Sequence, residues 1–152
     1  METKNYYDES GKLRNGECKS YYSDGNFDIG FYKDGKREGE WKEYHDNGKL
    51  FQVGSYKNGL KEGEFRSYHS SGELFIVSFW KSGEEDGEYV FYFYDGDLES
   101  ITHYKNGKKQ EEVLFNENKK IQSVINYADG LEESKFEFEY KYRKLINVKN
   151  ER

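Results

Sequence analysis

The sequence contains no proline, a single cysteine and a single methionine among its 152 residues. Proline would remove a hydrogen-bond donor from a strand, so its absence is compatible with continuous β-structure. Cys18 alone cannot form a disulfide within the chain, and the first residues lack the apolar stretch of a secretory signal. We therefore expect a cytoplasmic protein.

Long hydrophobic runs and a basic excess are also absent. No stretch approaches the roughly 18 apolar residues of a membrane-spanning helix, so we expect no membrane span. Acidic residues outnumber basic residues by 30 to 24, which gives a net charge of −6. This balance disfavours nucleic acid or an anionic lipid surface as the main partner.

Aromatic residues, in contrast, are abundant. Hydrophobic residues make up only 34% of the chain and charged residues 36%, a balance that is typical of disorder. However, 18% of the residues are aromatic, and each ring brings a large contact area that can sustain order without a thick aliphatic core. We expect one thin, elongated domain.

Three phase-locked glycine columns reveal an internal repeat of about 24 residues. The Gly-Glu pairs that begin at Gly16, Gly39, Gly63 and Gly87 are spaced by 23, 24 and 24 residues. The other two columns are Gly25, Gly48, Gly72 and Gly96, and Gly35, Gly59, Gly83, Gly107 and Gly130. We expect an N-terminal cap over 1–15, about five repeats over 16–130 and capping strands over 131–152.

Each unit is predicted to form a β-hairpin. Strands of six to seven residues alternate with Asn-Gly and Asp-Gly turns, on which the repeated glycines are expected to fall, and no segment shows a helical apolar period. The fold class is therefore all-β, a twisted antiparallel sheet of tandem hairpins with about twelve strands. Residues 136–142 alternate between aromatic and charged side chains and are expected to close the stack.

Aromatic side chains recur at fixed positions and are expected to stack between units. Trp41 and Tyr44 are three residues apart, so both faces carry aromatic rings unless a bulge intervenes. The columns are Tyr21, Tyr44, Tyr68, Tyr92 and Tyr140; Tyr32, Tyr56, Trp80, Tyr104 and Tyr127; Trp41, Phe65 and Tyr89; and the aliphatic Leu50, Leu74 and Leu98.

The spacing of these residues resembles a known repeat. Tyr-x-(Asp/Asn)-Gly at 32–35 and 56–59, Gly-Glu-(Trp/Phe) at 39–41 and 63–65, and Tyr-x-x-x-Gly-x-Leu at 44–50 and 68–74 are similar to the bacterial MORN-repeat variant. The resemblance covers roughly residues 7 to 130 and implies an elongated single-layer sheet that serves as a binding platform. The family includes YwqK-type antitoxins. The pattern weakens over 111–120, where we expect a distorted fifth unit.

No residue pattern indicates catalysis or a cofactor. His45 and His69 share a repeat position, but His103 does not. A zinc site needs three or four convergent ligands, and the only cysteine lies near the far end of the chain, so no metal site is expected. The glutamates of the Gly-Glu column recur in every unit. A catalytic acid and base need two carboxylates close together in different surroundings, so these repeated glutamates are expected to be structural. Cys18 replaces Trp41 of the next unit and is expected to pack as a small hydrophobe. We expect a protein that is not an enzyme.

The strongest departure from the repeat lies in residues 84–99, which hold seven acids and no base. Aromatic anchors ringed by charge are typical of protein interfaces, although these rings could equally form a thicker core. The predicted partner-binding residues are Glu84, Glu85, Asp86, Phe91, Phe93, Tyr94, Asp95 and Asp97.

Two classes of function are compatible with these features. The first is an antitoxin-like or immunity-like module that inhibits a bacterial toxin, an effector or a defence nuclease by covering its surface, with a basic protein as partner and no direct contact to nucleic acid. The second is a MORN-type scaffold or a platform at the membrane periphery.

Overall fold

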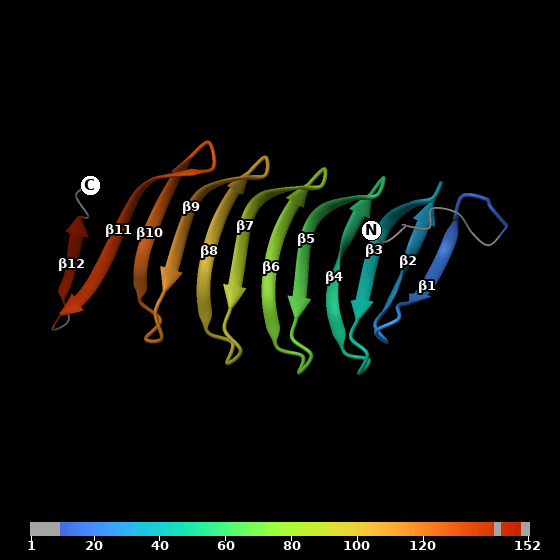
Figure 1. Cartoon of the computed structure of the whole chain (residues 1–152), viewed down its shortest axis with the longest axis horizontal. Helices are drawn as coiled ribbons and strands as arrows, with labels where there is room; N and C mark the ends of the chain where they lie inside the picture. Colours follow the sequence, from blue (N-terminus) through green and yellow to red (C-terminus); the bar gives the residue numbers. More distant parts are fainter. Residues whose placement is uncertain (1–9, 142–143, 150–152) are drawn as a thin grey trace.

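The computed structural model describes residues 10–141 and 144–149, and the side chains of residues 10–138. Twelve antiparallel strands form one open, twisted sheet in which each strand pairs with its neighbours in sequence (Figure 1). The strands are β1 (Gly16–Tyr21), β2 (Phe27–Lys33), β3 (Lys36–Tyr44), β4 (Leu50–Lys57), β5 (Leu60–Tyr68), β6 (Leu74–Lys81), β7 (Glu84–Tyr92), β8 (Leu98–Lys105), β9 (Lys108–Phe115), β10 (Ile121–Ala128), β11 (Leu131–Lys141) and β12 (Lys144–Lys149). The prediction of an all-β repeat sheet with about twelve strands is confirmed.

The two edges of the sheet carry different turns. At the upper edge in Figure 1, two-residue turns join the strands, and both residues have positive φ, as in Asn58 (52°) and Gly59 (83°). This geometry is that of a type I′ turn, which matches the twist of the paired strands. At the lower edge the turns are longer, as in the one where the amide of His45 donates to the carbonyl of Lys49 over 2.9 Å.

The glycines of the Gly-Glu column lie inside strands, so the expectation that the repeated glycines fall on turns is wrong for them. Gly39, Gly63 and Gly87 have φ values of 70°, 81° and 125° and lie within β3, β5 and β7. The strand register shifts in this region, for example between Ile29 and Phe31 of β2. Because the strands continue through these bulges, those of the central units are eight or nine residues long instead of six to seven.

A carboxylate near the start of each of β3, β5 and β7 holds the tight turn at the end of the following strand. The amide of Asn58 donates to Oε2 of Glu38 over 2.8 Å, and the amide of Ser82 donates to Oε2 of Glu62 over the same distance. Asp86 accepts in the same way from the amide of Asn106 over 3.3 Å. This repeated carboxylate contact fixes the position of each hairpin against its neighbour.

One face of the sheet carries a row of aromatic rings in edge-to-face contact, and we call it the aromatic face. Trp41 and Phe65 are its deepest members, each 1% exposed, because each ring lies over a glycine of the preceding strand, Gly30 and Gly54 respectively. Ring centroids along the row are 5.0 to 6.4 Å apart. The row consists of Tyr32, Trp41, Tyr56, Phe65, Trp80, Tyr89 and Tyr104. The prediction that Trp41 is buried between units is confirmed.

The opposite face carries the columns of Tyr44 and Leu50 among the described side chains. Tyr44 pairs with Leu50 across β3 and β4, and its ring stacks on Phe27 at a centroid distance of 4.6 Å. Trp41 and Tyr44 therefore lie on opposite faces of β3, and both faces carry aromatic side chains, as predicted. Cross-strand pairs of this kind are the unit that stabilises a sheet.

The ends of the sheet differ from the predictions in two places. The fifth unit is not distorted at its turn, because Asn116 takes the role of His45 and its amide donates to the carbonyl of Lys120 over 2.9 Å. The stack ends on β12, which pairs with β11, and not on residues 136–142. Part of the predicted N-terminal cap, residues 1–9, lies outside the described residues, as does Tyr142.

Candidate protein-binding surface

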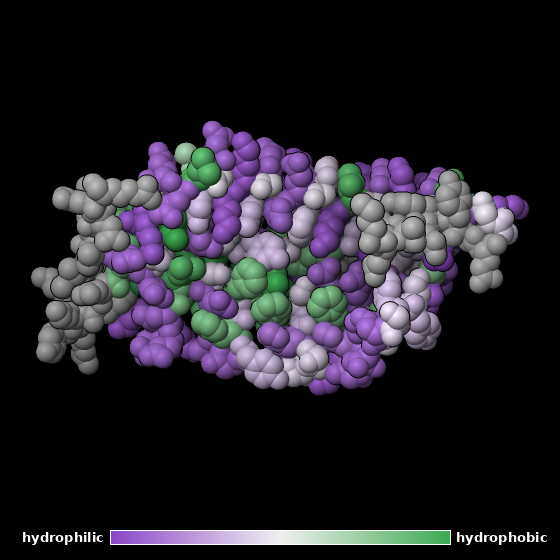
Figure 2. Space-filling model, viewed as in Figure 1, coloured by the Kyte–Doolittle hydropathy of each residue, from purple (hydrophilic) through white to green (hydrophobic). Residues whose placement is uncertain are grey.

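Four side chains form a cluster on the aromatic face where β5, β6 and β7 approach the lower edge. We call His69, Phe75, Phe91 and Tyr94 the aromatic cluster. The His69 ring is 4.5 Å from the ring of Phe75 and 5.1 Å from that of Tyr94, and Phe75 is 5.8 Å from Phe91. Figure 2 shows apolar side chains gathered over these middle strands, with hydrophilic residues around them.

The cluster is partly exposed because no second layer covers the sheet in the described part of the chain (Figure 1). Tyr94 is 64% exposed and its neighbour Phe93 is 38% exposed. In the unit of Trp41 the same two positions hold His45 and Asp46, so the repeat itself does not need rings there. Exposed apolar patches rimmed by polar residues mark interaction sites.

The structure separates the predicted site residues into two groups. Glu84, Glu85 and Asp86 begin β7 at the upper edge, whereas residues 91–97 lie at its lower end and in the following turn. At about 3.3 Å per residue, β7 is roughly 26 Å long from Glu84 to Tyr92, and roughly 17 Å of strand separates Asp86 from Phe91. Their role in binding stays a prediction, and the upper acids and the lower rings lie toward opposite ends of β7.

Three of the predicted acids already have partners within the fold. Asp86 contacts Lys105 over 3.1 Å in addition to holding the turn of Asn106. Asp95 accepts from the amide of Asp97 over 3.1 Å, and Asp97 pairs with Lys119 over 2.7 Å. Glu84 and Glu85 make no ion pair within the described part of the chain, which leaves them as the more available carboxylates.

Sequence reasoning missed His69 and Phe75 as members of the surface. The Nε2 atom of His69 is buried and has no hydrogen-bond partner among the described residues. In the preceding unit, Nε2 of His45 lies 3.2 Å from the carbonyl oxygen of Tyr68. The recurrence of His-x-x-x-x-x-Phe at 45–51 and 69–75 was the available signal, because the first pair also places its rings 5.0 Å apart.

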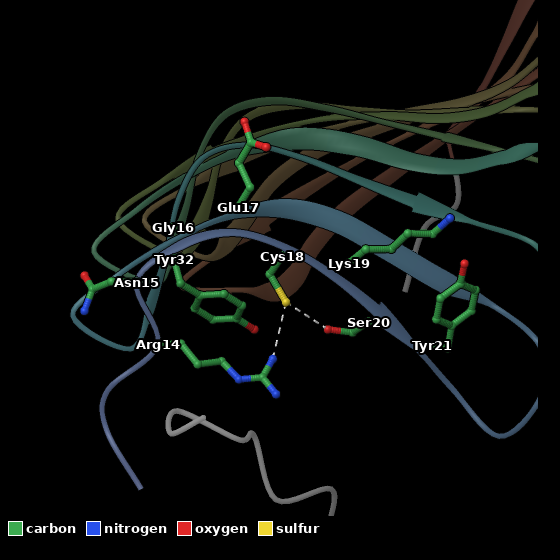
Figure 3. Close-up of a pocket in the computed structure, with 9 residues that line it drawn as sticks. All are labelled: Arg14, Asn15, Gly16, Glu17, Cys18, Lys19, Ser20, Tyr21 and Tyr32. Atoms are coloured by element: carbon green, nitrogen blue, oxygen red, sulfur yellow. Dashed lines mark hydrogen bonds between the residues drawn. The ribbon is translucent and has the colours of Figure 1, made fainter. Parts of the chain in front are cut away.

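Cys18 lines a pocket at the N-terminal end of the sheet (Figure 3). Arg14 Nη1 donates to its Sγ over 3.4 Å, and Oγ of Ser20 is 3.3 Å from the same sulfur. The expectation that Cys18 packs as a small hydrophobe is wrong, because its neighbours are polar. A thiol leaves open the space that the larger Trp41 fills in the next unit, which explains the hollow beside Tyr32.

A buried ionic cluster lies on the same face, between this pocket and the aromatic cluster. Arg37 Nη2 is 2.6 Å from Oδ2 of Asp28, which is 1% exposed, and Arg37 Nη1 is 2.9 Å from Glu43. The hydroxyl of Tyr22 donates to Oδ2 of Asp28 over 2.7 Å. Burial, followed by this hydrogen bond, raises the pKa of Tyr22. Each charge here has a partner, so the cluster fits a structural role.

Histidines and carboxylates do not converge on a metal in the described residues, where no group of three or more potential ligands was found. His103 lies on the face opposite the aromatic face, 3.5 Å from Glu88 and 3.5 Å from Glu111. No helix of the described chain is long and apolar enough to cross a membrane.

Comparison with known proteins identifies the repeat. No curated protein matches the chain. The profile of the MORN repeat variant matches residues 37–58, 61–82 and 85–106, which correspond to β3–β4, β5–β6 and β7–β8. These limits are narrower than the resemblance inferred from the sequence, although the hairpin register continues on both sides. The match indicates a repeat-based binding or scaffold module, a class that is generally non-catalytic. Three consecutive units at the centre of this sheet are thus similar to the MORN repeat variant.

Proposed function

We propose that this protein binds another protein through the aromatic cluster and inhibits it by covering its surface, as an antitoxin or immunity protein does for a bacterial toxin. The observation that carries the proposal is the cluster of His69, Phe75, Phe91 and Tyr94, in which three half-buried rings surround or adjoin the exposed ring of Tyr94 on one face of the sheet. Rigid aromatic anchors supply much of the affinity of protein interfaces.

The charge of the chain favours a basic partner. The net charge is −6, and Asp95 lies in the turn directly after Tyr94. Charge of opposite sign steers a partner toward its site and raises the association rate. A toxin or a defence nuclease that handles nucleic acid carries such a basic surface, and covering that surface would block its activity.

The experiment compares substitutions of exposed aromatic residues at two different places on the sheet. In the first, Tyr94→Ser at the cluster is combined with Phe93→Ser at its neighbour, and in the control Tyr21→Ser removes a ring that is 70% exposed at the far end of the sheet. Immobilised wild-type protein is used to capture a partner from cells. The purified partner is then titrated with all three proteins by calorimetry, and its toxicity is measured in growth assays with and without co-expression.

We expect the cluster variant to lose at least tenfold in affinity and to lose growth rescue, while Tyr21→Ser retains both, because removal of a central anchor costs about 1.4 kcal/mol or more. Equal binding by the two variants contradicts the cluster as the site. A partner that binds tightly without being inhibited contradicts inhibition and indicates a scaffold.

A further inference from the structure

A repeated cation covers the aromatic rings along the aromatic face. The guanidinium of Arg37 lies 4.2 Å from the ring centroid of Trp41 and 5.2 Å from that of Tyr56. In the next unit, Nζ of Lys61 lies 4.6 Å from Phe65 and 4.4 Å from Trp80. A cation over the face of an aromatic ring is held by the negative potential of that face.

The third unit keeps the two rings but replaces the cation. Tyr89 and Tyr104 stand where Phe65 and Trp80 stand one unit earlier, and their centroids are 6.0 Å apart at an angle of 58°. The residue at the position of Arg37 and Lys61 is Glu85, which pairs with Trp80 across β6 and β7. In the fourth unit the cation returns as Lys109, 5.4 Å from the ring of Tyr127.

We propose that Tyr89, Tyr104 and Glu85 form a vacant cation site that takes a lysine or arginine side chain of the partner protein. That the cation comes from a partner protein rests on the proposed function, whereas the site itself is inferred from the comparison of the repeat units. In two preceding units the chain supplies its own cation to the equivalent ring pair. In this unit it supplies a carboxylate, so a basic side chain from outside would meet two ring faces and an opposite charge.

The electrostatics of the three groups fit this role. Both tyrosines are half-buried, and burial, followed by the nearby Glu85 carboxylate, raises the pKa of each. The phenols therefore stay neutral and offer their ring faces at neutral pH. Of the cations in the flanking units, Lys61 interacts with the charge of Glu85 but covers the rings of Phe65 and Trp80. Lys109 is paired with Glu112 over 3.1 Å, which reduces its repulsion of an incoming cation.

The site is continuous with the aromatic cluster. The ring of Tyr89 is 5.1 Å from that of Phe91, which contacts Phe75. A partner that covers the cluster can therefore reach Tyr89 with a neighbouring side chain, and one basic residue beside apolar anchors would fit the whole surface. This arrangement gives Glu85 a role that Asp86, Asp95 and Asp97 cannot have, because those acids are engaged within the fold.

The test uses n-butylammonium chloride as a lysine probe and methylguanidinium chloride as an arginine probe, with sodium chloride at equal ionic strength as the reference. Ring signals of Tyr89 and Tyr104 are followed by NMR in the full-length protein. Glu85→Lys restores the cation of the repeat, and Glu84→Lys is the matched control, since it makes the same charge change one residue away on the opposite face of β7.

We expect saturable shifts of both tyrosine rings in the wild type and in Glu84→Lys, and none in Glu85→Lys, whose own ammonium fills the site and raises the melting temperature. Glu85→Gln keeps the side-chain size and is expected to weaken probe binding without a change in melting temperature. Wild-type shifts no larger than those in sodium chloride, or equal behaviour of the two lysine variants, would overturn the proposal.

This test is independent of the proposed function, because it needs no partner protein. If the probes bind but the captured partner does not respond to Phe93→Ser and Tyr94→Ser, the cation site stands and the cluster proposal fails. If the partner depends on the cluster while the probes do not bind, the cation site fails and the proposed function stands.

Discussion

The indole ring of Trp41 lies directly on Gly30 of the neighbouring strand, where an added Cβ atom would stand 2.2 Å from ring atom Cδ2. Gly54 has the same relationship to Phe65, at 2.3 Å from Cδ1. A single layer of sheet can bury large rings in this way, because the missing side chain on one strand leaves room for the ring of the next. The two glycines thus make room for the two most buried aromatic rings in the part of the chain that the structure describes.

Filling the space over Gly30 is expected to destabilise the fold. Gly30→Ala should lower the free energy of unfolding by about 1–3 kcal/mol, since the Trp41 ring or the strand must move to admit the methyl group. Urea denaturation measures the loss. In a Trp41→Ala background the same substitution should cost almost nothing, and an equal cost in both backgrounds would show that the clash with the ring is not the cause.

Removal of the ring itself is expected to cost more. Trp41 is 1% exposed, so Trp41→Ala should lower the free energy of unfolding by roughly 3–5 kcal/mol. Tyr21→Ala, at a ring that is 70% exposed, should cost far less and serves as the control. A loss below about 1 kcal/mol for Trp41→Ala in chemical denaturation would contradict the view that stability rests on the aromatic row.

Loss of Arg37 from the ionic cluster is expected to destabilise the fold strongly, and a second substitution at Asp28 is expected to restore part of that stability. Arg37→Met leaves the buried Asp28 carboxylate without its partner at 2.6 Å and should cost about 3–5 kcal/mol. The double variant with Asp28→Asn should be more stable than Arg37→Met alone, because the fully buried Asp28 charge is then removed. Thermal denaturation of both proteins decides the point, and a less stable double variant would contradict it.

Stability is expected to fall at alkaline pH. Burial, followed by the hydrogen bond to Glu112, raises the pKa of Tyr127 from 10.0 to about 12. Because the folded state favours the protonated phenol, its contribution is complete below pH 10 and is lost as the pH rises toward 12. Tyr22 and Tyr56 shift in the same direction.

Urea denaturation over that range should therefore show a steady loss of stability, with a shallower slope in Tyr127→Phe. Glu111→Gln, a change at the neighbouring acid on the opposite face, is the control and should keep the wild-type slope. An unchanged slope in Tyr127→Phe would show that the phenol of Tyr127 does not contribute to the alkaline loss.

The shape of the sheet is testable in solution. Twelve strands at about 4.8 Å spacing give a length of roughly 50 Å, and a flat body of that length has a radius of gyration near 18 Å. A compact protein of this size would have about 15 Å. Small-angle scattering that returns the compact value would contradict an extended single layer.

The hairpins could be predicted from the sequence because their two-residue turns need positive φ angles, which favour glycine and asparagine. Asn58-Gly59 and Ser82-Gly83 adopt positive φ at both positions, and glycine at the second marks each turn at a fixed spacing. The column of Gly39 was harder to interpret, since a positive φ serves a bulge as well as a turn. Composition alone does not separate those two uses.

The candidate surface was only partly predictable. The surplus rings of Phe91 and Tyr94 stood out because the repeat offers other residues at their positions. Linear proximity nevertheless joined them to Glu84, and a nine-residue strand carries the two groups to opposite edges. His69 and Phe75 belong to the preceding unit and reach the cluster only through sheet pairing, which sequence distance does not show.

The carboxylates of Glu38, Glu62 and Asp86 have a consequence for how such a protein changes in evolution. Each one links the tight-turn hairpin that contains it only to the next tight turn along the chain, so no contact of this type spans more than one step. Loss or duplication of a whole unit would preserve every such link and shift the far end by roughly 10 Å. The length of the sheet can therefore change in steps of one repeat by recombination, without substitutions in the contacts between the remaining strands.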